Sequence, residues 1–189
     1  MFQSANKQLF GIAGTKNMAA RNARSIIRER LNLLHTNIKQ PVFDALAEQT
    51  GYTAYELEHH VDLYRKLPTH EFSAIELFNQ IECSLLDDDP HALTTAAEES
   101  MLSKSAAIAH ASGYLVSGID SDYEAQWLRE CGGILIHLID QNATHSERDL
   151  FIDYRDYIIV VTNTAEPTAS QLDIVINRIL RDMQEKKAA

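Results

Sequence analysis

The sequence is poor in the residues that mark cross-linked, repetitive or disordered chains. Of its 189 residues, only two are cysteine, seven are glycine and four are proline. These low counts exclude a disulfide-rich scaffold, a collagen-like repeat and a low-complexity chain. Cys83 and Cys131 are too far apart in sequence to form the close pair of a zinc or redox motif. We therefore interpret both as small apolar residues of the interior.

Long apolar runs are absent as well. The longest candidate, 132–139, is interrupted by His137 and is far shorter than the roughly 18 apolar residues that cross a bilayer. The sequence thus predicts no membrane-spanning segment and no membrane partner. Its content of 45% hydrophobic and 23% charged residues is typical of an ordered globular protein. We expect that protein to be cytoplasmic and bacterial.

The sequence also lacks the signatures of common enzyme sites. It contains no Gly-x-Ser-x-Gly elbow of a serine hydrolase. Residues 11–16 offer two glycines and Lys16, but their spacing departs from a Walker A phosphate-binding loop, so we interpret them as a glycine hinge. We expect no catalytic residue, no cofactor and no enzyme activity. A site assembled from residues distant in sequence is the remaining enzymatic alternative.

Metal-binding patterns are incomplete. Glu56 and His59 share one face of a predicted helix, as in di-iron bundles, but the second Glu-x-x-His of such a site is missing. The acidic run 87–89 lacks the spaced ligands of a calcium loop and is interpreted as an exposed turn. His137, within an apolar stretch, is interpreted as a hydrogen-bonded residue of the interior. We therefore predict no metal site.

The sequence does have a strong separation of charge. Residues 1–40 contain seven Lys or Arg and one acid, whereas 41–189 contain ten bases and twenty-six acids. On this basis we divide the chain into a basic N-terminal segment, 1–40, and an acidic domain, 41–189. A basic segment of this kind binds either acidic protein surfaces or nucleic acid phosphates. The total charge of −10 favours a protein, because DNA binding depends on many phosphate contacts.

Capping signals and apolar spacing predict helices through most of the chain. An amphipathic helix is predicted over 17–34 and another over 170–185. Four capping boxes are predicted to precede helices: Thr53 with Glu56, Ser73 with Glu76, Ser121 with Glu124, and Thr144 with Glu147. The predicted fold class is therefore mainly α, a multi-helix bundle around a central antiparallel helical hairpin at 91–142. Ala109 and Trp127 are its expected core residues.

One segment is ambiguous. The spacing of apolar residues in 154–162 favours a helix, yet its aromatic and β-branched residues also suit one short buried strand. We choose the helix, because no second strand is evident in the sequence. Two copies of the chain could instead pair such strands across a dimer axis.

These features favour a helical regulatory protein that binds a protein partner and forms a homo-oligomer, with a homodimer as the simplest form. The expected contact residues are four arginines of the basic helix: Arg21, Arg24, Arg28 and Arg30. The alternative is a DNA-binding transcriptional regulator that uses this helix together with 43–62. The latter segment resembles a helix-turn-helix only in part, since its second helix is acidic.

Overall fold

The computed structural model describes residues 8–14, 18–67, 71–104, 110–141, 150–161 and 165–188. The chain divides into two compact units, and each is described by itself. The first, formed by 1–36 and 104–189, is called the α/β unit. The second, formed by 37–103, is called the helical unit. The division at residue 40, which rests on charge alone, stays a prediction.

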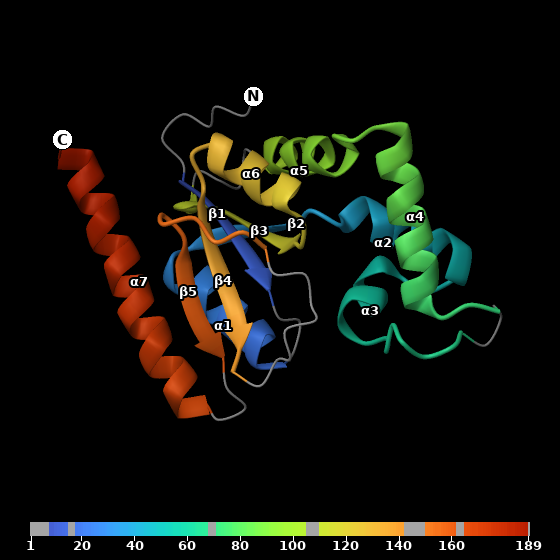
Figure 1. The fold of residues 1–189 in the computed structure, drawn as a ribbon, viewed down its shortest axis with the longest axis horizontal. Coiled ribbons are helices and arrows are strands. Elements are labelled where there is room, and N and C mark those ends of the chain that lie inside the picture. The colour runs from blue at the N-terminus through green and yellow to red at the C-terminus, as the bar shows by residue number, and fades with distance from the viewer. Residues whose placement is uncertain are drawn as a thin grey trace. The chain divides into compact units, whose positions relative to one another are not determined.

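A five-stranded parallel sheet forms the centre of the α/β unit (Figure 1). The strands lie in the order β2-β3-β1-β4-β5, so that β1 is central and β2 and β5 form the edges. Their bounds are β1 Gln8–Gly14, β2 Leu33–Asn37, β3 Gly113–Ile119, β4 Ile134–Asp140 and β5 Tyr157–Val161.

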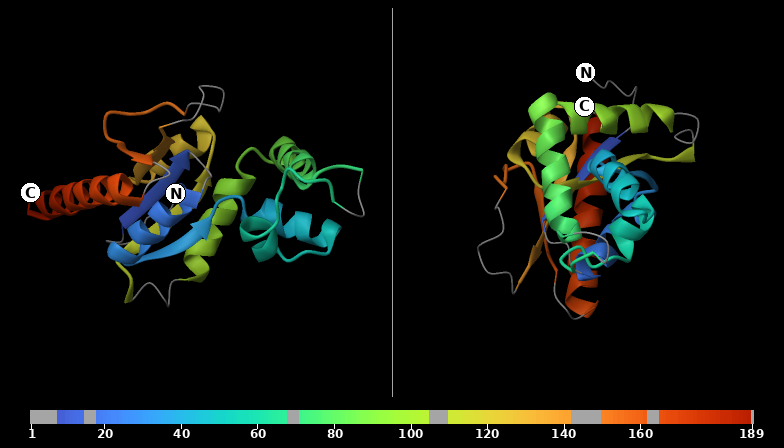
Figure 2. Two further views of the ribbon diagram at one scale, coloured as in Figure 1. Left: turned by 90° about the horizontal axis from the view of Figure 1, so that it is seen from below. Right: turned by 90° about the vertical axis from the view of Figure 1, so that its right-hand side faces the viewer.

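Helices cover both faces of this sheet. Helices α1 (Met18–Arg30) and α7 (Ala165–Ala188) pack on the face that carries Phe10 and Ile12. Successive side chains of a strand point to opposite faces, so Gly11 lies on the other side. There α6 (Asp122–Glu130) approaches so closely that a Cβ at Gly11 would lie 2.3 Å from Leu128 Cδ2. The course of α7 along the α/β unit can be followed in Figure 2.

The prediction of a mainly helical fold is wrong. The chain has an α/β fold, and the expected helical hairpin at 91–142 consists instead of α5 (Ala92–Ser103), β3, α6 and β4. The strands β3 and β4 are buried on both faces and therefore read as continuous apolar runs rather than as alternating ones. Such a short run cannot be told from a buried helix by periodicity alone. Ala109 lies outside the described residues, and Trp127 is half-buried on α6.

The helix predicted over 17–34 and the choice of a helix at 154–162 need correction too. Helix α1 ends at Arg30, and the chain then enters β2. The second segment contains β5, which pairs in parallel with β4 from Tyr157 to Val161. Its pairing partner β4 lies in the predicted helical hairpin at 91–142. Because β4 was not recognised as a strand, β5 had no evident partner in the sequence.

Three of the four predicted capping boxes are confirmed, and the fourth, at Thr144 and Glu147, lies outside the described residues. Each of the three serine or threonine side chains accepts a hydrogen bond from the backbone N–H of its glutamate, and α3, α4 and α6 begin directly after it. The helical unit comprises α2 (Gln40–Thr50), α3 (Ala54–His59), α4 (Ala74–Asp88) and α5. Among the described helices, none has the length and apolar content needed to cross a membrane.

Helix α7 is held against β5 by a polar contact beside its apolar one. The phenol of Tyr157 donates a hydrogen bond to Asp182. The pKa of Tyr157 is raised to about 12, mainly by burial and secondly by this hydrogen bond. Leu172, Ile176 and Ile179 supply the apolar contact, as the spacing in 170–185 predicted.

Replacing Tyr157 by phenylalanine is expected to lower the free energy of unfolding by about 0.5–1.5 kcal/mol, the usual net value of one hydrogen bond. Because the folded pKa is raised, this contribution is complete below the unfolded value near 10 and disappears as the pH approaches 12. Denaturant unfolding at neutral and high pH measures it. A variant as stable as the wild type at neutral pH would contradict the contact.

Candidate functional site

The strand connections diverge at the carboxyl end of the sheet. From β1 the chain passes into α1 on one face, whereas from the adjacent β3 it passes into α6 on the opposite face. In open parallel sheets, ligands bind outside the carboxyl ends of strands at a position where the connections diverge in this way. The carboxyl ends of β1 and β3 are therefore the first place to look for a site.

Gly14 ends β1 at this carboxyl end with φ of +100°. A Cβ at this position would lie 2.2 Å from the carbonyl oxygen of Leu138 on β4. Both the backbone conformation and the lack of space require glycine here. The prediction of a hinge at 11–16 is wrong for its first part, because residues 11–14 belong to β1. Thr15 and Lys16 lie outside the described residues.

The arrangement that follows is strand, short connection, helix. Helix α1 begins at Met18, and its first turn contains no acid. The free N–H groups and the partial positive charge at such a helix start favour anions. This strand-to-helix transition is the structural context of phosphate-binding loops, although the spacing of a Walker A motif is absent.

Polar side chains gather at the carboxyl ends of β2 and β3. His35 Nε2 lies 2.7 Å from Ser117 Oγ. Lys104 Nζ donates to the His35 carbonyl at 2.8 Å and to Thr36 Oγ1 at 2.9 Å. Burial lowers the pKa of Lys104. An ammonium group has three N–H donors, so two fixed bonds leave one for a ligand.

The pairing of a serine with a histidine resembles half of a catalytic triad, but accessibility argues against that role. Ser117 is only 1% exposed, whereas a nucleophile must be reached by its substrate. We interpret the bond between His35 and Ser117 as the satisfaction of two polar groups within the sheet.

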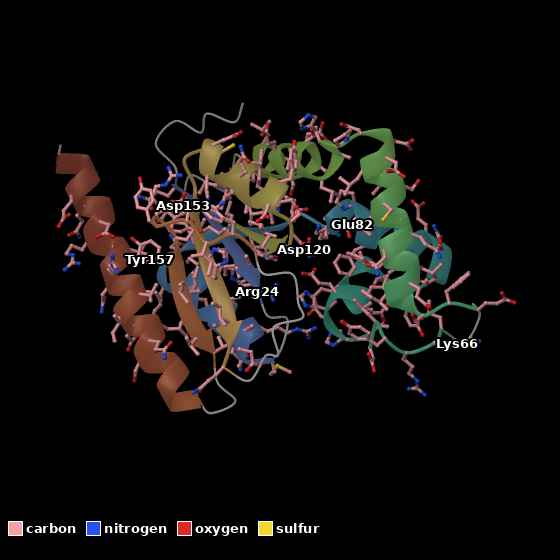
Figure 3. The ribbon with its side chains drawn as sticks, viewed as in Figure 1. Arg24, Lys66, Glu82, Asp120, Asp153 and Tyr157 are labelled. Atoms are coloured by element: carbon pink, nitrogen blue, oxygen red, sulfur yellow. The ribbon has the colours of Figure 1, made fainter. Side chains whose placement is uncertain are left out.

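The end of β3 is fixed by the cap of α6. Buried Glu124 accepts hydrogen bonds from the backbone N–H groups of Asp120, at 3.0 Å, and Ser121, at 3.2 Å. Figure 3 labels Asp120, the first residue after β3. The cap thus holds the backbone in place at the carboxyl end of β3.

A second polar cluster lies on the α6 face of the sheet, and its groups bind one another. Asp156 Oδ2 accepts hydrogen bonds from Arg129 Nη2 at 2.6 Å, His137 Nε2 at 2.9 Å and the Asp153 N–H at 2.9 Å. Burial raises the pKa of Asp156, but these bonds outweigh it and leave the pKa below its usual value. The cluster attaches the segment before β5 to β4 and α6, so its role is structural. His137 is a hydrogen-bonded interior residue, as predicted.

The four arginines predicted as contact residues all lie on α1. Arg21 and Arg28 are exposed, while Arg24 is half-buried; Figure 3 labels Arg24. Arg30 forms an ion pair with Asp173 of α7. The structure thus gives Arg30 an intramolecular role and leaves Arg21 and Arg28 on the surface.

The other sequence candidates have ordinary structural roles. Glu56 caps α3 through its bond to Thr53, which lowers the pKa of the glutamate. Cys83 is exposed on α4 and Cys131 is half-exposed, so the prediction that both lie in the interior is wrong for Cys83.

Sequence reasoning missed the polar group at the carboxyl edge, formed by His35, Thr36, Lys104 and Ser117. The signal that could have found it is the alternation of apolar runs with helices, which is typical of parallel sheets.

Comparison with protein-family models found no match for the chain, and comparison with curated proteins found no significant similarity.

Proposed function

We propose that the α/β unit binds a small phosphate-bearing molecule at the carboxyl ends of β1 and β3. The divergence of α1 and α6 from adjacent strands carries the proposal, because it leaves the strand ends as a place for a ligand. Gly14 keeps this edge free of a side chain, and the first turn of α1 supplies donors for an anion. Lys104 adds a positive charge at the neighbouring strand end.

Phosphate is the chemistry that these donors fit best. A phosphate group accepts several hydrogen bonds at once and is stabilised by the positive end of a helix. Binding of the ligand, without a chemical step, is the function proposed. The expectation that the chain is not an enzyme stays a prediction, as does its cytoplasmic localisation.

Calorimetric titration and thermal unfolding with inorganic pyrophosphate and with nucleoside mono-, di- and triphosphates test this proposal. A ligand present at 100 times its Kd should stabilise the fold by about 2.7 kcal/mol. Lys104→Gln should weaken binding about tenfold or more, because a charged donor is lost. Lys66→Gln, at an exposed position of the helical unit, is the matched control and should change nothing. Failure of every probe to bind at millimolar concentration would refute the proposal.

A second function, recognition of an acidic protein partner through α1, is favoured by one observation. Exposed Arg21 and Arg28 lie on the same helix as two exposed apolar residues, Met18 at 68% and Ile26 at 36%. Apolar anchors flanked by positive charge are typical of a helix that docks on an acidic surface. Self-association of the chain would be one form of this interaction.

The double variant Arg21→Gln, Arg28→Gln tests this second function and the DNA-binding alternative together. Partner binding predicts salt-sensitive association by light scattering or native capture, which the variant weakens while remaining folded. DNA binding predicts retention on a random duplex with a steep salt dependence that the variant flattens. If the variant changes neither association nor retention, both roles of the arginines are excluded.

A further inference from the structure

The helical unit carries all of the net charge of the protein. It contains three Lys or Arg and thirteen Asp or Glu, a net charge of −10, whereas the fourteen bases and fourteen acids of the α/β unit cancel. The carboxylates of the helical unit therefore outnumber its bases by ten. This excess makes the helical unit a surface for cations or basic molecules.

A groove lies on this unit between α2 and α4. It has a volume of about 330 Å³ and is lined by Gln49 of α2 and by Leu77, Gln80, Ile81, Ser84 and Leu85 of α4. The spacing of the α4 residues places them along one side of the helix. Ile81 and Leu85 are only half-buried, so apolar side chains are available to a partner.

Three acidic residues are close in sequence to residues that line this α2–α4 groove. Glu48 precedes Gln49 on α2 and is exposed. Asp88 lies four residues after Ser84, so it continues the line of groove residues, and the exposed Asp87 is beside it. Among the described residues, these three carboxylates form no ion pair.

The charges at the end of α4 are unfavourable for the isolated chain. The carboxyl terminus of a helix carries partial negative charge and is stabilised by bases. Here the last turn contains no base, and Asp87 and Asp88 lie in it instead, whereas the Asp89 carboxylate accepts a hydrogen bond from the His91 N–H just before α5. A positively charged partner would remove this repulsion, whereas a neutral or acidic one would not. Local conflict of this kind is typical of functional sites.

We propose that the α2–α4 groove binds an amphipathic helix of a protein partner, one that carries apolar residues at helical spacing and Lys or Arg beside them. The half-buried Ile81 and Leu85 receive the apolar residues, and the bases face Glu48, Asp87 and Asp88. Binding of a helix in an apolar groove is an established mode of peptide recognition. The excess of negative charge excludes nucleic acid as the occupant.

The test uses the full-length protein and a fluorescent peptide. The peptide is designed with leucines at helical spacing and flanking lysines, with about 18 residues to match the 15-residue α4. Fluorescence anisotropy should show saturable binding that weakens with added salt. A peptide with glutamate in place of lysine should not bind, and a scrambled peptide of the same composition should bind at least tenfold more weakly.

Matched variants locate the peptide on the groove. Asp87→Asn with Asp88→Asn removes two exposed charges that follow its α4 residues in sequence and should weaken binding about fivefold to tenfold. Glu71→Gln with Glu99→Gln removes the same number of exposed charges elsewhere on the unit and should leave the affinity unchanged. Both pairs lie on the surface, so circular dichroism should show both variants folded.

Three results would overturn the proposal. The first is the absence of binding to the wild-type protein. The second is equal binding of the designed and scrambled peptides, which would show that composition rather than a helical face is recognised. The third is equal weakening in both double variants, which would show that the total charge rather than the α2–α4 groove attracts the peptide.

Discussion

Replacing Asp156 by alanine is expected to lower the free energy of unfolding by about 3–5 kcal/mol, the cost of removing one partner from a buried ion pair. The Asp156 side chain is 2% exposed, and Arg129 is 12% exposed. Its loss leaves the ring of His137 without its acceptor and the guanidinium of Arg129 without its carboxylate partner, so that Arg129 keeps only its bond to the Phe151 carbonyl. Denaturant unfolding measures the change.

Asp153→Ala is the control for this variant. The Asp153 carboxylate pairs with the exposed Arg155, and an exposed pair contributes only about 0.2–1 kcal/mol. Similar losses of stability in the two variants would show that the buried cluster contributes no more stability than the exposed pair.

Acid should reproduce the effect of the Asp156 substitution. The folded-state pKa of Asp156 is lowered, so its carboxylate contributes stability above the unfolded pKa of about 3.9 and loses it as the pH falls further. The wild type should therefore lose stability more steeply than Asp156→Ala below about pH 4. Parallel pH dependences of the two proteins would contradict the low pKa.

Replacing Phe10 by alanine is expected to destabilise the protein by about 3–5 kcal/mol, because a large cavity would open in the core. Phe10 is 1% exposed on the central strand β1 and packs beneath α1 and α7. The helical bundle that the sequence favoured gave this residue no role. The large loss of stability expected for Phe10→Ala thus follows from the position of Phe10 in the sheet.

Phe151→Ala is the matched control, since the Phe151 side chain is 67% exposed and surface substitutions change stability by about 0.5 kcal/mol or less. Equal melting temperatures of the Phe10 variant and the wild type would show that β1 is not at the centre of the core.

Local signals in the sequence predicted local structure well. The boxes at Thr53, Ser73 and Ser121 begin helices. These features depend on hydrogen bonds between residues three or four positions apart. The sequence of each short segment therefore contains the information needed to predict these helix ends.

The sheet could not be predicted in the same way, because its stability comes from contacts between distant segments. Phe10 pairs with Leu115 on one side and Ile134 on the other. A parallel strand buried on both faces gives no alternation, so the runs in β3 and β4 matched helical spacing by chance. The true signal was the βα succession, which becomes visible only when several segments are read together.

The candidate site was missed for the same reason. His35, Lys104 and Ser117 come from three segments, and only the strand order brings them to one edge of the sheet. The spacing of 11–16 departs from a Walker A motif, whereas the place of Gly14 between a parallel strand and a helix depends on the fold.

The most direct test of a ligand at the carboxyl edge is the amide resonance of Gly14 during a titration with pyrophosphate. The proposal predicts saturable shifts of Gly14 and of the first-turn amides of α1, with a weaker affinity in Lys104→Gln. Shifts confined to Arg21 and Arg28 on the exposed side of α1, or no shifts at all, would contradict it.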